Sequence, residues 1–197
     1  MKKSDNPIAV RSRQMLMDAL IRLMDKKEYS KINVTEIVEE AQLVRKTFYR
    51  NYETKDEVLN DYIEILVQEY IDALGDITDE NFTLQKFAQI YFEFWQKQVE
   101  FLILLDKNDM IYLIQNRLTN PDPIIKKMAG CEQISEEDDL RNCCTAYVAG
   151  GFWYVLFDWV HSGAKKSPED MASLLDKVMS INNKEFFINE YKKHMIR

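Results

Sequence analysis

Between Leu43 and Lys55 the sequence gathers side chains of the kinds that contact nucleic-acid phosphates and base edges. Four cations stand there against one acid, Glu53, and they are interleaved with hydroxyl and aromatic groups. Cationic and hydroxyl groups bond phosphate oxygens, and Arg or Lys also donates to guanine in the major groove. Such groups on one short helix predict a nucleic-acid contact. The residues concerned are Arg45, Lys46, Thr47, Tyr49, Arg50, Tyr52 and Lys55.

The residues that usually perform catalysis or hold metals are few and scattered. Three cysteines, Cys131, Cys143 and Cys144, have no C-x-x-C spacing, and the two histidines, His161 and His194, stand far apart. We therefore expect no metal site, no disulfide framework and no cofactor. The sequence shows no nucleophile with a partner base and no phosphate-binding loop, so we expect no catalytic residue and no enzyme. Adjacent Cys143 and Cys144 leave a redox sensor as a weaker alternative.

The cationic and hydroxyl residues between Leu43 and Lys55 must be positioned by helices, because the sequence shows helical periodicity. Only five Gly and four Pro occur in 197 residues, which favours helices over the many turns of sheet folds. Asn33 with Glu36, and Thr54 with Glu57, have the spacing of capping boxes and predict two helix starts. Apolar stripes and breaks predict helices over residues 8–26, 34–41, 45–50, 55–75, 84–95, 101–105, 110–118, 139–161 and 168–181, with a loop at 120–137. The expected fold is all-α, with three N-terminal helices followed by about six in a larger body.

The charge distribution also separates the N-terminal helices from the larger body. The net charge is −7, but residues 1–60 hold 12 Lys+Arg against 10 Asp+Glu, and the excess of acid lies in the remainder. The N-terminal module is therefore the part that phosphate does not repel. No apolar h-region follows the first lysines, and the longest apolar run, 146–157, is too short to span a bilayer. We expect a cytoplasmic protein with no membrane partner.

Two short helices joined by a tight turn, the second one basic, form a helix-turn-helix pattern. The segments INVTEIVEEA (32–41) and TFYRNY (47–52), with Thr54 and Lys55, resemble the DNA-binding domain of the TetR family of transcriptional regulators. The resemblance covers about residues 10–66. The segments AGGF (149–152) and SPEDMA (167–172) are similar to the last two helices of one large TetR-like group. Gln42 stands where the family usually has Gly, and Val44 where a small hydroxyl residue is common, so we expect a slightly shifted helix start.

The resemblance implies a DNA-binding domain over 1–54 and a ligand-binding and dimerisation domain over 55–197. Thr35 and Lys55 would clamp the DNA backbone on either side of the recognition helix, and Phe48 and Leu43 would belong to the core. Arg50 would contact phosphate or only solvent. The implied contacts with double-stranded DNA are Thr35, Arg45, Lys46, Thr47, Tyr49, Arg50 and Lys55.

The implied regulator is a homodimer, because two recognition helices must read successive turns of one operator. The last two helices would supply the dimer contacts, including Leu174. Gly150 and Gly151 weaken a helix, so a dimer seam or a kink would explain them. An aromatic group could wall an apolar effector pocket, or simply fill the core: Phe87, Tyr91, Trp95, Phe101, Tyr147 and Phe152.

The function expected from this resemblance is sequence-specific transcriptional regulation, by a repressor that leaves its operator when a small apolar or amphiphilic ligand binds. The alternative is a TetR-fold coactivator or adaptor that works through protein partners.

Overall fold

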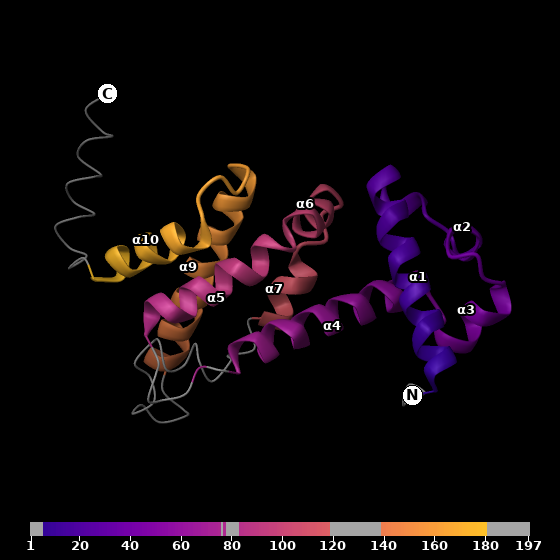
Figure 1. Ribbon diagram of the computed structural model, residues 1–197, viewed down its shortest axis with the longest axis horizontal. Coiled ribbons are helices and arrows are strands. Elements are labelled where there is room, and N and C mark those ends of the chain that lie inside the picture. The colour runs from indigo at the N-terminus through magenta and orange to yellow at the C-terminus, as the bar shows by residue number, and fades with distance from the viewer. Residues whose placement is uncertain (1–5, 76, 78–82, 119–138, 181–197) are drawn as a thin grey trace.

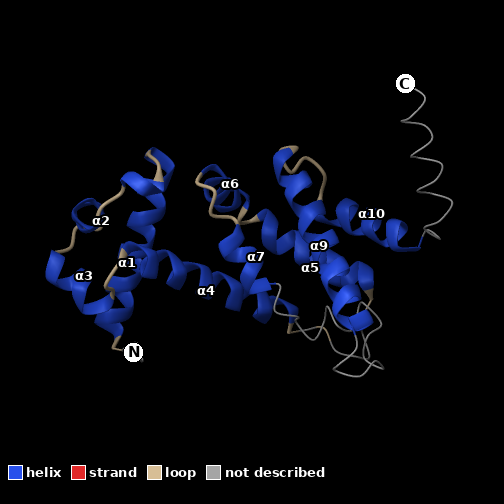
Figure 2. Cartoon of the chain, turned by 180° about the vertical axis from the view of Figure 1, so that it is seen from behind, coloured by secondary structure: helices blue, strands red, loops and turns tan. Residues whose placement is uncertain are grey.

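The computed structural model describes residues 6–75, 77, 83–118 and 139–180, and every regular element among them is a helix. No strand occurs among them (Figure 2). The all-α prediction is thereby confirmed. The elements are α1 (Pro7–Lys26), the 3-10 helix η1 (Tyr29–Lys31), α2 (Val34–Glu40), α3 (Arg45–Asn51), α4 (Lys55–Leu74), α5 (Leu84–Gln96), α6 (Val99–Lys107), α7 (Tyr112–Leu118), α9 (Asp139–His161) and α10 (Pro168–Ser180).

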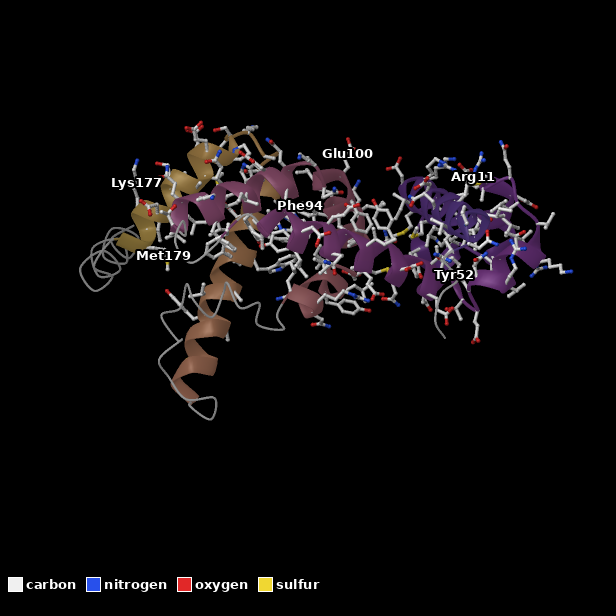
Figure 3. The ribbon with its side chains drawn as sticks, turned by 60° about the horizontal axis from the view of Figure 1, so that its bottom comes forward. Arg11, Tyr52, Phe94, Glu100, Lys177 and Met179 are labelled. Atoms are coloured by element: carbon white, nitrogen blue, oxygen red, sulfur yellow. The ribbon has the colours of Figure 1, made fainter. Side chains whose placement is uncertain are left out.

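The helices are arranged along one axis. Helices α1, α2 and α3 cluster at one end, α5, α9 and α10 lie at the other, and the long α4 runs between them (Figure 1). Arg11 and Tyr52 mark the N-terminal end, whereas Lys177 and Met179 on α10 mark the opposite end (Figure 3). Helix α1 packs against α2, α3 and α4, while α5 packs against both α4 and α10. The basic module therefore projects from the acidic body.

The N-terminal module closes around the apolar stripe of α1. Leu16 and Leu20 on α1, Ile37 on α2 and Phe48 on α3 are each fully buried. These four side chains come from three helices that are too short or too polar to be stable alone, so their shared burial supplies most of the stability. Phe48 and the partly buried Leu43 join this core, as predicted.

Local signals account for the helix starts. Asn33 and Glu36 form a complete capping box, with bonds of 3.1 and 3.0 Å. The Thr54 hydroxyl accepts from the Glu57 N–H at 3.3 Å, but the Glu57 carboxylate turns instead to the Glu53 N–H at 2.7 Å. That second predicted box is therefore only half formed.

Three details differ from the expected pattern. Helix η1 has no counterpart among the expected helices, and α7 begins two residues later than expected, after a turn in which Asp109 has a φ of +57°. Helix α3 begins at Arg45 without the shift that Gln42 and Val44 suggested. The expected loop 120–137 lies outside the described residues. No helix in the described part of the chain combines the length and apolar character that a bilayer span requires.

Candidate nucleic-acid interface

The turn between α2 and α3 is a helix C-cap that requires a left-handed residue. The Leu43 N–H donates to the Val38 carbonyl at 2.8 Å and the Gln42 N–H to Glu39 at 3.0 Å, which is the bond pattern of a Schellman motif. Gln42 occupies the left-handed position with a φ of +55°. The chain therefore makes the same turn that Gly would make, at a conformational cost.

Helix α3 presents its polar side chains to solvent. Arg45, Lys46, Tyr49 and Arg50 are exposed and Thr47 is half-buried, whereas Phe48 on the inner face is 0% exposed. Because Phe48 is anchored in the core, the helix cannot rotate without exposing a large aromatic ring. The structure thus places five of the predicted contact residues on one fixed helix.

Several cations of the module have acidic partners, whereas those of α3 have none among the described residues. Arg22 and Lys26 bond the Glu40 carboxylate at 2.8 and 3.3 Å, and Lys27 bonds Glu36. Within the part of the chain that the structure describes, no carboxylate pairs with the cations of α3, which are Arg45, Lys46 and Arg50. Their positive charge is therefore available to an external anion.

Lys55 does not fit the role that sequence resemblance implied. Its ammonium donates to the carbonyls of Tyr29, Ile32 and Ser30 at 2.7, 2.8 and 3.4 Å. It also lies 4.4 Å from the centre of the Tyr29 ring. These contacts use the three donors of the ammonium within the protein. We therefore leave Lys55 out of the proposed interface, while Thr35 stays exposed in the first turn of α2.

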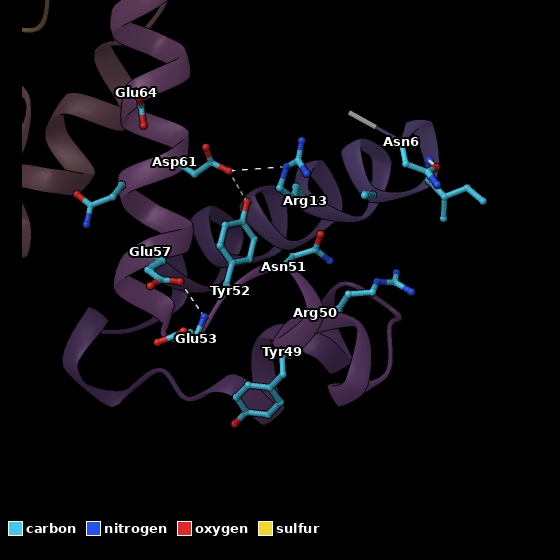
Figure 4. A pocket seen from close by; sticks show the side chains of 13 residues that line it. Asn6, Arg13, Tyr49, Arg50, Asn51, Tyr52, Glu53, Glu57, Asp61 and Glu64 are labelled. Atoms are coloured by element: carbon cyan, nitrogen blue, oxygen red, sulfur yellow. Dashed lines mark hydrogen bonds and ion pairs between the residues drawn. The ribbon is translucent and has the colours of Figure 1, made fainter. Parts of the chain in front are cut away.

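Behind α3 lies a polar cavity of about 640 Å³ between the start of α1, the end of α3 and α4 (Figure 4). On its wall the Tyr52 hydroxyl donates to the buried Asp61 carboxylate at 2.6 Å, and Arg13 lies 4.0 Å from the same oxygen. Burial and the bond to Asp61 raise the pKa of Tyr52 well above its usual value, so the hydroxyl stays a donor. Glu53, Glu57 and Glu64 also line this cavity, which makes it unattractive to phosphate.

Most of the predicted effector residues form a closed aromatic cluster. The Phe152 ring lies 5.3 Å from the Phe87 ring and 5.4 Å from the Tyr91 ring, and all three are buried. Trp95 is fully buried, and its indole N–H has no hydrogen-bond partner among the described residues. Burial raises the pKa of Tyr91 well above its usual value, so it is neutral.

Two members of the predicted group lie apart from this cluster. Phe101 packs on α4, with its ring 4.8 Å from that of Tyr62. Tyr147 is 66% exposed, so the structure does not place it on the wall of an enclosed pocket. A ligand contact by Tyr147 therefore stays a prediction. Helix α9 is apolar around much of its circumference, so its sequence does not mark the buried face.

The residues predicted for dimer contacts lie on an open surface. A Cβ atom added at Gly150 or Gly151 would meet no described atom within 4 Å, so close packing against the described residues does not explain these glycines. Leu174 on α10 is 42% exposed. The other large apolar side chains exposed on α9 and α10 are Tyr147, Tyr154, Val178 and Met179. We call Gly150, Gly151, Tyr147, Tyr154, Leu174, Val178 and Met179 the open apolar face.

The redox alternative stays untested. Cys143 is exposed on α9. The side chain of Cys144 and the whole of Cys131 lie outside the described residues. Among the residues that are described, no group of three or more His, Cys, Asp or Glu side chains is arranged to hold a metal ion.

Comparison with known proteins places this module in a recognised family. Residues 16–62 match the family model described as "Bacterial regulatory proteins, tetR family". A TetR transcriptional regulator from Streptococcus agalactiae 2603V superposes with a TM-score of 0.64 at 20% identity, covering 86% of this chain and 94% of that one. The fatty acid degradation regulator FadR from Bacillus halodurans superposes with a TM-score of 0.63 at 15% identity, covering 92% and 99%. At such identities the structural likeness concerns the fold. No curated protein sequence matches the chain.

Proposed function

Because this chain belongs to the TetR family of DNA-binding transcriptional regulators, which are not enzymes, we propose that it is a cytoplasmic, homodimeric repressor released from its operator by a small apolar or amphiphilic ligand. The observation that carries the DNA-binding part is the outer face of α3. Its three cations have no acidic partner among the described residues, while the buried Phe48 fixes the orientation of the helix.

In the proposed interface, α3 enters the major groove. Arg45, Lys46 and Thr47 at its start approach base edges and neighbouring phosphates, and Tyr49 and Arg50 bond the backbone. Thr35 at the start of α2 contacts the backbone beside the groove. The proposed boundary between DNA-binding and effector domains falls between residues 54 and 55, where Thr54 caps α4.

One recognition helix reads only a few base pairs, so the proposal requires a second copy of the chain. Two copies would place their α3 helices about 34 Å apart on one side of the duplex. The open apolar face supports a symmetric seam, because on α9 the exposed Tyr147 and Tyr154 flank two glycines at helical spacing, and no described residue would contact a Cβ atom added at either glycine.

The effector part of the proposal rests on the buried aromatic cluster. The cluster of Phe87, Tyr91, Trp95 and Phe152 offers apolar surface, and the Trp95 indole N–H is a donor that no described residue accepts from. The similar fold of a fatty acid degradation regulator favours an acyl or other amphiphilic ligand. Such a ligand would act by binding one conformation of the dimer more tightly than another.

The test of DNA binding is selection of duplexes from a random pool by the full-length protein, followed by affinity measurements at several salt concentrations. We expect a sequence-specific duplex to emerge. Lys46→Ala should weaken its binding and lower the salt slope by about one unit. Lys97→Ala, which removes the same charge from an exposed site in the body, should leave both unchanged. A wild-type protein that selects no sequence would favour the adaptor alternative.

A further inference from the structure

A hydrogen bond joins the end of α6 in the body to η1 in the DNA-binding module. Asn108 is the C-cap of α6, and its Oδ1 accepts from the Tyr29 N–H at 2.7 Å, across 79 positions of sequence. Its Nδ2 donates to the Leu104 carbonyl of its own helix at 2.9 Å. The Asn108 amide group is therefore oriented on α6 through its Nδ2 donor, and it bonds the DNA-binding module through its Oδ1 acceptor.

The backbone N–H, the backbone carbonyl and the hydroxyl of Tyr29 are all hydrogen-bonded. The Lys55 ammonium bonds its carbonyl at 2.7 Å, and the Tyr29 hydroxyl donates to the Asp56 carboxylate. Tyr29 is buried, and burial together with the bond to Asp56 raises the pKa of its phenol well above the usual value, so the hydroxyl remains a donor. We call Asn108, Tyr29, Lys55 and Asp56 the joint.

The joint contacts the chain on both sides of the helix-turn-helix pair, before α2 and after α3. Tyr29 and the Ile32 carbonyl, which Lys55 also bonds, lie just before α2. Lys55 and Asp56 form the first turn of α4, which follows directly after α3. A displacement of the end of α6 would therefore be transmitted to the start of α2 and to the end of α3 together.

Helix α6 is itself anchored in the body at other points. The Phe101 ring packs on Tyr62 of α4 at 4.8 Å. Asp106, two residues before Asn108, lies 3.0 Å from His161 Nε2 at the end of α9. Helix α6 thus links α9, which carries part of the open apolar face, to the base of the DNA-binding module.

We propose that Asn108 is a positioning residue that sets the orientation of the helix-turn-helix pair relative to the body, and so the distance between the two recognition helices of a dimer. This inference rests on the proposed function. The hydrogen bond to Tyr29 restricts the module to one orientation, so a dimer with the bond intact accepts only one spacing of half-sites.

The test compares full-length variants on the duplex that the wild-type protein selects, and on copies with its centre lengthened or shortened by one or two base pairs. Asn108→Ala removes the bond to Tyr29. We expect its affinity for the selected duplex to fall about threefold to tenfold, the value of one hydrogen bond, with an unchanged salt slope. We also expect a smaller penalty on the altered spacings than the wild type shows.

Two controls separate positioning from a general loss of stability. Asn108→Asp keeps an acceptor for the Tyr29 N–H and should keep the strict spacing preference. Asn60→Ala removes a different contact between the body and α4, the 2.8 Å bond from Arg117, and should also keep it. Because the spacing preference is a ratio within one preparation, partial unfolding does not change it.

The outcomes are distinguishable. If the wild type selects a duplex and Asn108→Ala binds all spacings as the wild type does, the inference is overturned while the proposed function stands. If Asn60→Ala relaxes the spacing as much as Asn108→Ala, the joint has no special role. If the wild type selects no duplex, the proposed function itself fails.

Discussion

Gln42 holds a left-handed backbone conformation, with a φ of +55°, that an L-residue adopts only at a cost. We predict that Gln42→Gly raises the free energy of unfolding by about 1 kcal/mol, because the C-cap geometry is kept and the steric penalty of Cβ is lost. Urea denaturation of the full-length protein measures this. Gln42→Ala keeps the Cβ and should give no gain, so equal stabilities of the Gly and Ala variants would contradict the explanation.

Tyr52 and Tyr49 lie three residues apart, but loss of the hydroxyl should affect stability at Tyr52 and DNA binding at Tyr49. Tyr52→Phe removes the 2.6 Å bond to the buried Asp61 and should lower the free energy of unfolding by about 1–2 kcal/mol. Tyr49→Phe removes an exposed hydroxyl and should change that free energy by less than about 0.5 kcal/mol. Under the proposed function it instead weakens binding to the selected duplex. Denaturation and DNA titration of both variants check the pair, and a stability loss shared by both would contradict it.

At the scale of elements, the sequence predicted what local signals encode. Asn33 with Glu36 marked the start of α2 because both partners of that box lie within one turn. The core assignment of Phe48, which the family resemblance implied, is confirmed, since its side chain is fully buried. The placement of five predicted contact residues on α3 follows from the same period, whereas their contact with DNA remains a proposal.

The features that the sequence did not predict involve partners that are distant in sequence. Lys55 looked like a phosphate contact, but its ammonium bonds carbonyls 23 to 26 residues away. The bond between Asn108 and Tyr29 spans 79 positions, and the type of neither residue indicates which residue it bonds. Tyr147 is exposed although it was predicted to line a pocket, because α9 is apolar around much of its circumference and its sequence pattern does not mark the buried face. Long-range pairing and the buried face of a uniformly apolar helix both depend on the tertiary fold.

The contact between α6 and α9 should depend on pH. His161 Nδ1 faces the Phe157 carbonyl at 2.8 Å and Nε2 faces Asp106 at 3.0 Å, so both nitrogens face acceptors. The Phe157 carbonyl, followed by Asp106, raises the pKa of His161 above its usual value. A raised folded-state pKa stabilises the protein below the unfolded value of about 6.5, and this contribution is lost as the pH rises through the folded value.

We predict that this contribution is at most about 0.5 kcal/mol, because the pair is exposed to solvent. Unfolding of the wild type and of His161→Gln, measured from pH 5 to pH 9, checks it. The difference in stability between the two should shrink as the pH rises. A difference that stays constant over this range would show that His161 contributes packing alone.

On the scale of the whole molecule, the net charge of −7 conceals an uneven distribution. The basic α3 lies in the module at one end, and α5, α9 and α10 lie at the other (Figure 1). Phosphate is repelled by the acidic body and attracted by α3, so DNA should approach one end of the molecule only. The open apolar face lies on α9 and α10, away from α3, which leaves it available to a second copy.

Gly150 offers a test of that seam which does not damage the single chain. We predict that Gly150→Leu leaves the fold of each chain intact, because a Cβ there meets no described atom within 4 Å and Leu is the better helix former. The larger side chain should, however, separate two α9 helices that approach closely across the seam. Sedimentation should then show monomers where the wild type shows dimers. Affinity for the selected duplex should fall by about a hundredfold, since each half-site would be bound without its partner. Gln68→Leu, on an exposed position of α4, serves as the control and should leave both unchanged. If Gly150→Leu remains dimeric and binds with wild-type affinity, the dimer interface does not include this part of α9.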